Sequence, residues 1–153
     1  MEIAELTAQQ VNSLILEQFG VYLELKEEGH YFLFRREDVE YISWSLTSLP
    51  AMENAISYGL LLCAYSPKKK LVYPSIVDRV SGYPTVEIQS VKKAIKFSRG
   101  ENVALPSLQE FEQKQIIVTH NGYPLAFGQV LFGEFQPLID IGWYLREAEK
   151  VSL

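Results

Sequence analysis

Apolar positions in the first part of the chain are spaced first for a helix and then for strands. Ala8 to Phe19 has apolar residues at helical spacing, with Thr7 as a capping residue and Gly20 as a left-handed stop, so a helix is expected there. Two strand-like runs follow, Val21 to Leu25 and Tyr31 to Arg35, with a polar, glycine-containing turn between them. This pattern predicts a β-hairpin directly after the helix.

The pattern is less regular further along. Val39 to Trp44 is aromatic and β-branched, and its periodicity does not decide between strand and helix. Ser45 to Ile56 has helical spacing that is interrupted by Pro50. Because proline breaks a helix interior, this segment predicts short, broken helix.

A second hairpin with a basic tip is expected before the middle of the chain. The apolar runs Tyr58 to Tyr65 and Leu71 to Tyr73 flank the turn Ser66-Pro67-Lys68-Lys69-Lys70. Pro74 suits the first position of a helix, so one or two helical turns are expected from Ser75 to Val80.

A turn-forming cluster, Ser81-Gly82-Tyr83-Pro84, separates this helix-rich half from a strand-rich half. We therefore expect an α+β protein with two domains, residues 1–82 (mixed α/β) and residues 83–153.

The second half has clear local signals. Thr85 to Ile88 alternates like a strand, and a helix capped by its first residue is expected from Ser90 to about Phe97. The apolar runs Ile116 to His120 and Leu125 to Phe132 are joined through Asn121-Gly122. This dipeptide is a strong short-range signal for a β-hairpin.

Composition places the chain among compact proteins. Of 153 residues, 48% are apolar and 22% charged, which is enough to bury a core. The longest apolar run, Tyr58 to Tyr65, is far below the roughly 20 residues that span a bilayer. No signal peptide is recognisable at the N-terminus, and the single cysteine, Cys63, lies in an apolar run. A cytoplasmic protein without membrane association is expected.

The charge is unevenly distributed. The net charge is −5, yet the segment from Ser66 to Arg99 has eight basic and two acidic residues and carries +6, whereas six basic and seventeen acidic residues elsewhere give −11. A concentrated basic segment on an acidic protein can bind a polyanion locally. The alternative is that these side chains only solvate turns and helix faces. The basic residues of the segment are Lys68, Lys69, Lys70, Arg79, Lys92, Lys93, Lys96 and Arg99.

The helix expected after Ser90 is amphipathic. One stripe is predicted to face a core: Val91, Ala94, Ile95 and Ser98. Basic residues share another side, at i, i+4 and i+7 with one flanking lysine: Lys92, Lys96, Arg99 and Lys93. Such a face can neutralise several phosphates and gain affinity by counterion release.

Signals for catalysis are weak. His30 and His120 each lie beside a glycine-containing turn and lack a cluster of further ligands, and Cys63 has no activating neighbours in the sequence. No phosphate-binding glycine loop of a standard pattern is present. The prediction is a protein without catalysis, cofactor or metal.

Three motifs in the second half, at residues 97–103, 121–128 and 140–146, resemble those of PUA domains, which are compact β-barrels of RNA-modifying and ribosome-assembly proteins. Phe97-Ser98-Arg99-Gly100-Glu101-Asn102-Val103 resembles the signature after the first PUA helix. Asn121-Gly122-Tyr123-Pro124-Leu125-Ala126-Phe127-Gly128 resembles the segment in which a small-residue turn precedes Pro-Leu-Gly-x-Gly. Asp140-Ile141-Gly142-Trp143-Tyr144-Leu145-Arg146 is similar to the Asp-x-Gly-x-Tyr-x-Arg ending of the Nip-seven family of large-subunit ribosome-assembly factors, especially its archaeal members.

The chain length and plan are also similar to that family, which joins an N-terminal "pre-PUA" α/β domain to a C-terminal PUA pseudo-β-barrel. Glu40-Tyr41-Ile42-Ser43 resembles the family's Val-Tyr-Tyr-Val-Ser. The likeness is specific over about the last 60 residues and architectural in the first 80.

The resemblance implies RNA binding in rRNA processing, with a ribosomal RNA precursor or a U-rich single strand as ligand, assembly or processing proteins as further partners, and no DNA. PUA domains hold RNA between the first helix, the following glycine loop and the last strand, where Trp143 and Tyr144 are expected here. Gly100 would let backbone amides approach phosphate. The implied RNA-binding residues are Lys92, Lys93, Lys96, Arg99, Gly100 and Arg146, with Lys68, Lys69 and Lys70 as a secondary basic hairpin.

One difference from the Nip-seven family favours functions other than RNA binding. Archaeal relatives carry more positive charge near the last strand, whereas Arg146 is followed here by Glu147 and Glu149, which repel phosphate. The alternatives are a protein-interaction adaptor that has lost most RNA affinity and an accessory subunit of an RNA-modification enzyme.

Overall fold

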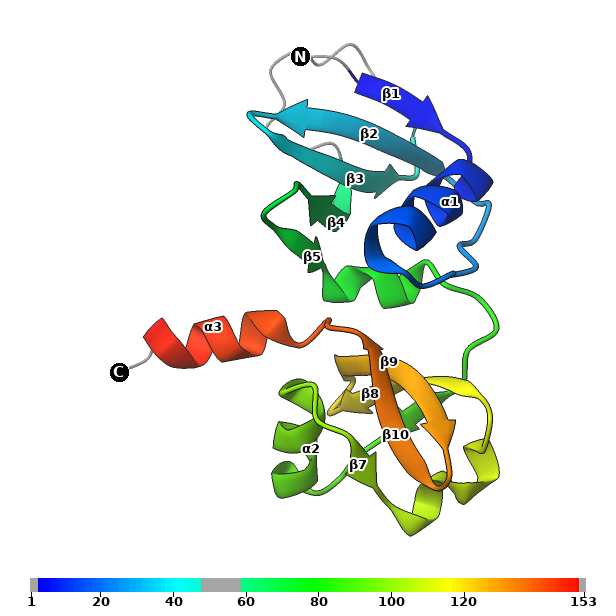
Figure 1. Cartoon of the computed structure of the whole chain (residues 1–153). Helices are drawn as coiled ribbons and strands as arrows, with labels where there is room; N and C mark the ends of the chain where they lie inside the picture. Colours follow the sequence, from blue (N-terminus) through cyan, green and yellow to red (C-terminus); the bar gives the residue numbers. More distant parts are fainter. Residues whose placement is uncertain (1–2, 48–58, 152–153) are drawn as a thin grey trace. The chain divides into compact units, whose positions relative to one another are not determined.

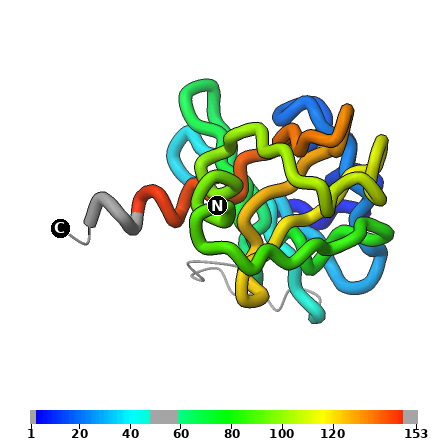
Figure 2. The backbone as a smooth tube through the Cα atoms, turned by 90° about the horizontal axis from the view of Figure 1, so that it is seen from below, coloured from blue at the N-terminus to red at the C-terminus, as the bar shows by residue number. Residues whose placement is uncertain are grey.

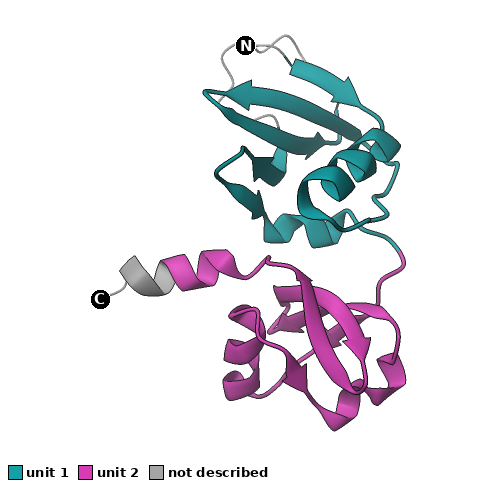
Figure 3. Ribbon diagram, viewed as in Figure 1, with its two compact units in different colours: residues 1–81 teal, residues 82–153 magenta. Residues whose placement is uncertain are grey.

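The protein folds into two compact units, Met1–Ser81 and Gly82–Leu153 (Figure 3). The computed structural model describes residues 3–47 and 59–151. Each unit combines helices with a five-stranded sheet, so the chain is α+β. The division falls inside the predicted turn cluster, one residue before the expected boundary.

Unit 1 is built on an antiparallel sheet in which the strands follow their order in the sequence (Figure 1). The helices among its described residues are α1 (Ala8–Phe19) and the 3-10 helix η1 (Pro74–Asp78). The strands are β1 (Ile3–Leu6), β2 (His30–Arg36), β3 (Val39–Ser45), β4 (Leu60–Tyr65) and β5 (Lys70–Val72).

The prediction of α1 is confirmed together with its caps. The Thr7 hydroxyl accepts from the Gln10 amide, and the Gln10 side chain accepts from the Thr7 amide. Gly20 ends the helix at a φ of 76°, which favours glycine. Val11 and Ile15 are fully buried on the face that packs into the unit.

The hairpin predicted after α1 is wrong. Val21 to Leu25 forms no strand, and only Leu25 makes an isolated bridge, to Val80. Both edges of β2 are already occupied, by β1 on one side and β3 on the other, so β2 has no edge left for this segment. The segment still buries Leu23 and Leu25.

Other expectations in unit 1 are resolved by the fold. The segment Val39 to Trp44, for which the sequence did not decide between strand and helix, is strand β3. The expected hairpin with the basic tip is formed by β4 and β5. The broken helix predicted for Ser45 to Ile56 lies largely outside the described residues; Ser45 itself ends β3. Pro74 begins η1, as its missing amide hydrogen suits a first turn.

Unit 2 has a sheet in the order β6-β8-β9-β10-β7, in which β6 is parallel to β8 and the other pairs are antiparallel. The predicted hairpin through Asn121-Gly122 is confirmed as β8–β9. Its strands are β6 (Thr85–Glu87), β7 (Val103–Ala104), β8 (Gln115–His120), β9 (Tyr123–Leu131) and β10 (Glu134–Ile139); its helices are α2 (Val91–Ser98), the 3-10 helix η2 (Pro106–Phe111) and α3 (Trp143–Val151).

Helix α2 is confirmed with its cap, but it turns a different side to the core than predicted. Ala94 and Phe97 are buried, and the Phe97 ring meets Phe135 of β10 edge to face at 5.1 Å. Val91 and Ile95 were expected to face the core, yet 63% and 39% of their surfaces are exposed. The large Phe97 ring, at i+3 from Ala94, sets the buried face.

The last element is a helix and not the strand that was expected for Trp143 and Tyr144. Leu, Arg, Glu, Ala and Lys dominate the segment after Tyr144, and these are strong helix formers. Figure 1 and Figure 2 show the described part of α3 extending outward from its own unit after β10. Among the described residues, no helix combines the length and the hydropathy that a membrane-spanning helix needs.

Candidate nucleic-acid interface on helix α2

The basic residues of α2 remain accessible around one short helix. Lys92 and Arg99 are exposed, and Lys93 and Lys96 are half-buried. The Ser90 hydroxyl caps the helix by accepting from the Lys93 amide. Within residues 3–47 and 59–151, none of these four cations forms an ion pair. Their charge is therefore free to attract an anion.

The same face is not purely cationic. Val91 and Ile95 are one helical turn apart and exposed beside Lys92 and Arg99. A phosphate-binding surface gains nothing from aliphatic side chains, so this face also has the chemistry of a contact with an apolar group.

Gly100 has a backbone role at the end of α2. Its φ of 72° places it in the left-handed region, and an added Cβ would meet nothing within 4 Å. The Gly100 amide donates to the Phe97 carbonyl, and the Glu101 amide to the Lys96 carbonyl. The amides expected to approach phosphate are thus already engaged by the helix, and the reason for the glycine is its conformation.

Arg146 lies against α2, but on helix α3 and not on a strand. Its Nη1 donates to the Ser98 carbonyl at 2.7 Å and to Asp140 Oδ1 at 3.2 Å, and its Nη2 contacts Asp140 Oδ2. The hydrogen bond to Asp140 raises the pKa of the guanidinium further. A cation suits the carbonyl end of α2, so Arg146 joins α3 to α2.

The Asp-x-Gly-x-Tyr-x-Arg motif has an internal structural explanation. A Cβ on Gly142 would lie 2.7 Å from the Ser98 carbonyl oxygen and 2.8 Å from that of Leu125, so glycine is required where α3 begins. The Tyr144 hydroxyl donates to the Pro124 carbonyl at 3.2 Å. The four residues that define the motif, Asp140, Gly142, Tyr144 and Arg146, therefore all contribute to the packing of α3 against its own unit.

The secondary basic hairpin belongs to unit 1. Lys68, Lys69 and Lys70 are exposed at the β4–β5 turn, which Ser66 orders by accepting from the Lys69 amide at 3.0 Å. Lys70 Nζ donates to the Gln18 carbonyl at the end of α1. Lys68 and Lys69 are therefore the more available pair.

The β9–β10 turn contains a feature that the sequence pattern did not reveal. Phe132 has a φ of 56° and is 96% exposed, and Gly133 follows at 72°. A left-handed conformation costs about 1–2 kcal/mol for a residue with a Cβ. Phe132 was counted as the end of an apolar strand; the glycine after it was the available signal for a tight turn.

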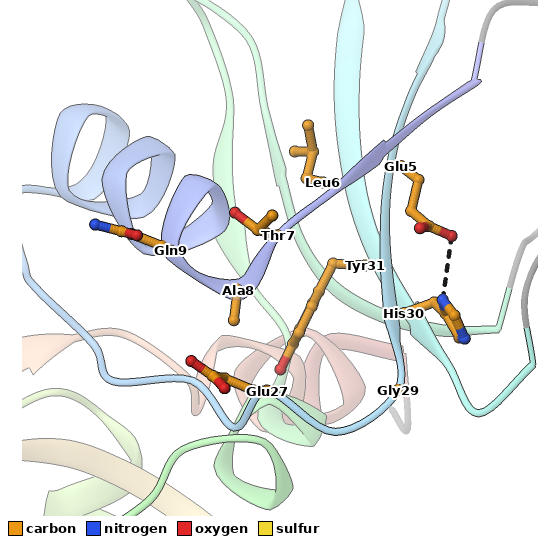
Figure 4. Close-up of a pocket in the computed structure, with 9 residues that line it drawn as sticks. All are labelled: Glu5, Leu6, Thr7, Ala8, Gln9, Glu27, Gly29, His30 and Tyr31. Carbon is orange, nitrogen blue, oxygen red and sulfur yellow. Dashed lines mark hydrogen bonds and ion pairs between the residues drawn. The ribbon is translucent and has the colours of Figure 1, made fainter.

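A pocket of about 450 Å³ opens in unit 1 beside β1 and β2 (Figure 4). There the His30 Nδ1 lies 3.1 Å from Glu5 Oε1, and the Glu27 carboxylate lies apart from this pair. In the part of the chain that the structure describes, no three His, Cys, Asp or Glu side chains are grouped as metal ligands.

Two further residues with potentially reactive side chains are Cys63 and His120. Cys63 is fully buried, and burial raises the pKa of its thiol to about 12. The half-buried His120 of β8 contacts the carbonyl of Ile88, the residue after β6, through its Nδ1 at 2.6 Å.

No family model and no curated protein matches the chain.

Proposed function

We propose that this protein is a non-catalytic RNA-binding factor of ribosome biogenesis, acting in large-subunit rRNA processing. In this proposal unit 2 is a PUA pseudo-β-barrel, unit 1 is a pre-PUA domain, and the whole is of the Nip-seven type. The observation that supports it most directly is the set of four cations around α2 that form no ion pair with any described residue. Each phosphate they neutralise adds affinity by releasing counterions.

Arg146 enters the proposal in a changed role. Its guanidinium is held by Asp140 and the Ser98 carbonyl, so it orients α3 against α2. The binding residues are then Lys92, Lys96 and Arg99, with Lys93 at the edge of the face.

The test is fluorescence anisotropy with a labelled U-rich single-stranded RNA and a matched duplex at several salt concentrations. The triple variant Lys92→Gln, Lys96→Gln, Arg99→Gln should bind more weakly. For a single strand its salt slope should fall by about 2, from roughly 0.7 per lost phosphate contact. An unchanged slope contradicts this interface.

The matched control is Arg36→Gln with Lys114→Gln, which removes two exposed charges outside both basic surfaces. Both variants alter the net charge in the same direction, so a loss of RNA affinity that is confined to the triple variant of α2 identifies a local interface. Equal losses per charge would point to a diffuse effect of net charge.

A second candidate is a protein-interaction adaptor. The exposed Val91 and Ile95 favour it, because apolar side chains on a helix face suit a protein partner. It predicts that wild-type protein shows no saturable RNA binding even at low salt.

A further inference from the structure

The Phe132 side chain is presented to solvent at a strained position. Its ring is 96% exposed, and its left-handed backbone is one that bulky residues avoid. The β8–β9 turn adopts nearly the same backbone with Asn121 and Gly122, at φ of 51° and 79°. Asparagine would therefore build the β9–β10 turn more readily, and the phenylalanine contributes little to the fold around it.

The surroundings of Phe132 are acidic. Glu112 accepts from the Gly133 amide at 2.8 Å, and Glu134 follows in the chain with its carboxylate bonded to Asn102. Two carboxylates beside the ring oppose stacking on a nucleic acid, whose phosphates they repel. They favour a partner with an apolar site and a basic rim.

Helix α2 of the same unit presents an apolar site with a basic rim. Val91 and Ile95 are neighbours at i and i+4 and form one exposed apolar pair against which a ring can pack. Lys92 and Arg99 flank this pair and form no ion pair within the described residues. Since Phe132, Val91 and Ile95 are all exposed, the two surfaces do not cover each other within one chain.

We propose that a second copy of this chain packs Phe132 against Val91 and Ile95, with Glu112 and Glu134 facing Lys92 and Arg99. In the proposed head-to-tail arrangement the contact joins two different surfaces and leaves one free surface of each kind at the ends. It is small and partly electrostatic, so association is weak and decreases with salt. Docking of the second copy covers the α2 face and would therefore compete with RNA. This competition rests on the proposed function, whereas the docking itself does not.

The test is sedimentation velocity of the full chain without RNA, over a concentration series at low salt. Wild-type protein should form dimers and larger species as its concentration rises. Phe132→Asn removes the ring and suits the turn, and Ile95→Gln alters an exposed position of α2, so both variants should fold. Each alone should associate at least about tenfold more weakly, as loss of an interface anchor predicts.

Mixing the two variants distinguishes this contact from others. Phe132→Asn retains an intact α2 face, and Ile95→Gln retains an intact Phe132, so a 1:1 mixture should form a heterodimer that cannot extend. Wild-type protein that stays monomeric throughout overturns the proposal. So does a Phe132→Asn variant that associates like wild type, or a mixture that remains monomeric. Because no RNA is present, failure of the proposed RNA binding does not affect this result.

Discussion

The two ends of strand β9 have turns of similar backbone that differ in the residue at the left-handed position. At the first end, Asn121 and Gly122 donate their amides to Glu87, and the Pro124 carbonyl accepts from Tyr144. At the other end, Phe132 has a left-handed backbone and an almost fully exposed ring. The glycine of each turn donates its amide to a glutamate, Glu87 or Glu112, so the first end is distinguished by its contact with α3 and the second by the strained Phe132.

The first end also holds the start of α3. Gly142 packs against the carbonyls of Ser98 and Leu125, and Arg146 bonds Ser98 and Asp140. Substitutions there should therefore destabilise the unit, and a suitable substitution at the second end should stabilise it. The following predictions test this contrast, beginning with the largest effect.

Gly142→Ala should cause the largest loss of stability. The new Cβ would lie under 3.0 Å from two backbone carbonyl oxygens, which cannot move as a side chain can. Overpacking of this kind costs about 3 kcal/mol in free energy of unfolding. Urea unfolding followed by circular dichroism measures it.

The matched control is Gly100→Ala, where the Cβ meets open space and only the positive φ is strained. Its loss should be about 1 kcal/mol. Equal losses for the two variants would show that the close approach of Gly142 is unimportant.

Arg146→Ala should cost about 1–2 kcal/mol, because the Ser98 carbonyl and Asp140 lose a charged donor at a partly exposed site. Arg99→Ala, at an exposed position without an ion pair in the described residues, should stay within about 0.5 kcal/mol. Thermal unfolding of both variants gives the comparison. If Arg99→Ala destabilises as much as Arg146→Ala, the two arginines do not differ in the way the structure indicates.

Arg146 also shows where prediction from sequence stopped. Its charge and motif are visible in the sequence, but its role depends on Ser98, 48 residues away, and on Asp140. Local signals were sufficient for α1, α2 and the β8–β9 hairpin, because capping residues and Asn-Gly act within a few positions. They failed for Val21 to Leu25, since strand pairing in unit 1 is decided by β1 and β3.

The buried face of α2 was mispredicted for a related reason. Two stripes of the helix are apolar, and only the position of Phe135 in the fold selects the one with Phe97. The choice left Val91 and Ile95 exposed among the cations, so the mixed character of the candidate site could not be read from helical spacing alone.

Phe132→Asn should stabilise unit 2 by about 1 kcal/mol, because asparagine adopts the left-handed region more readily than phenylalanine. The reverse exchange, Asn121→Phe, should destabilise by a similar amount. Melting temperatures of both variants check the pair. A loss of stability in Phe132→Asn would mean that the ring supports the fold, against its 96% exposure.

Glu87→Gln should have the smallest effect, and one that depends on pH. Hydrogen bonds from the amides of Gly122 and Asn121, and then from Thr119, hold the pKa of Glu87 below its ordinary value. A carboxyl group with a lowered folded-state pKa stabilises the fold above its unfolded pKa, and this contribution is lost as the pH falls through the folded value. Wild type should therefore melt above Glu87→Gln near neutral pH, with the difference shrinking below about pH 4. Melting curves between pH 7 and pH 3, with Glu110→Gln as an exposed control, measure it. A difference that stays constant over this range would show that Glu87 supports the Asn121-Gly122 turn by its shape and not by its charge.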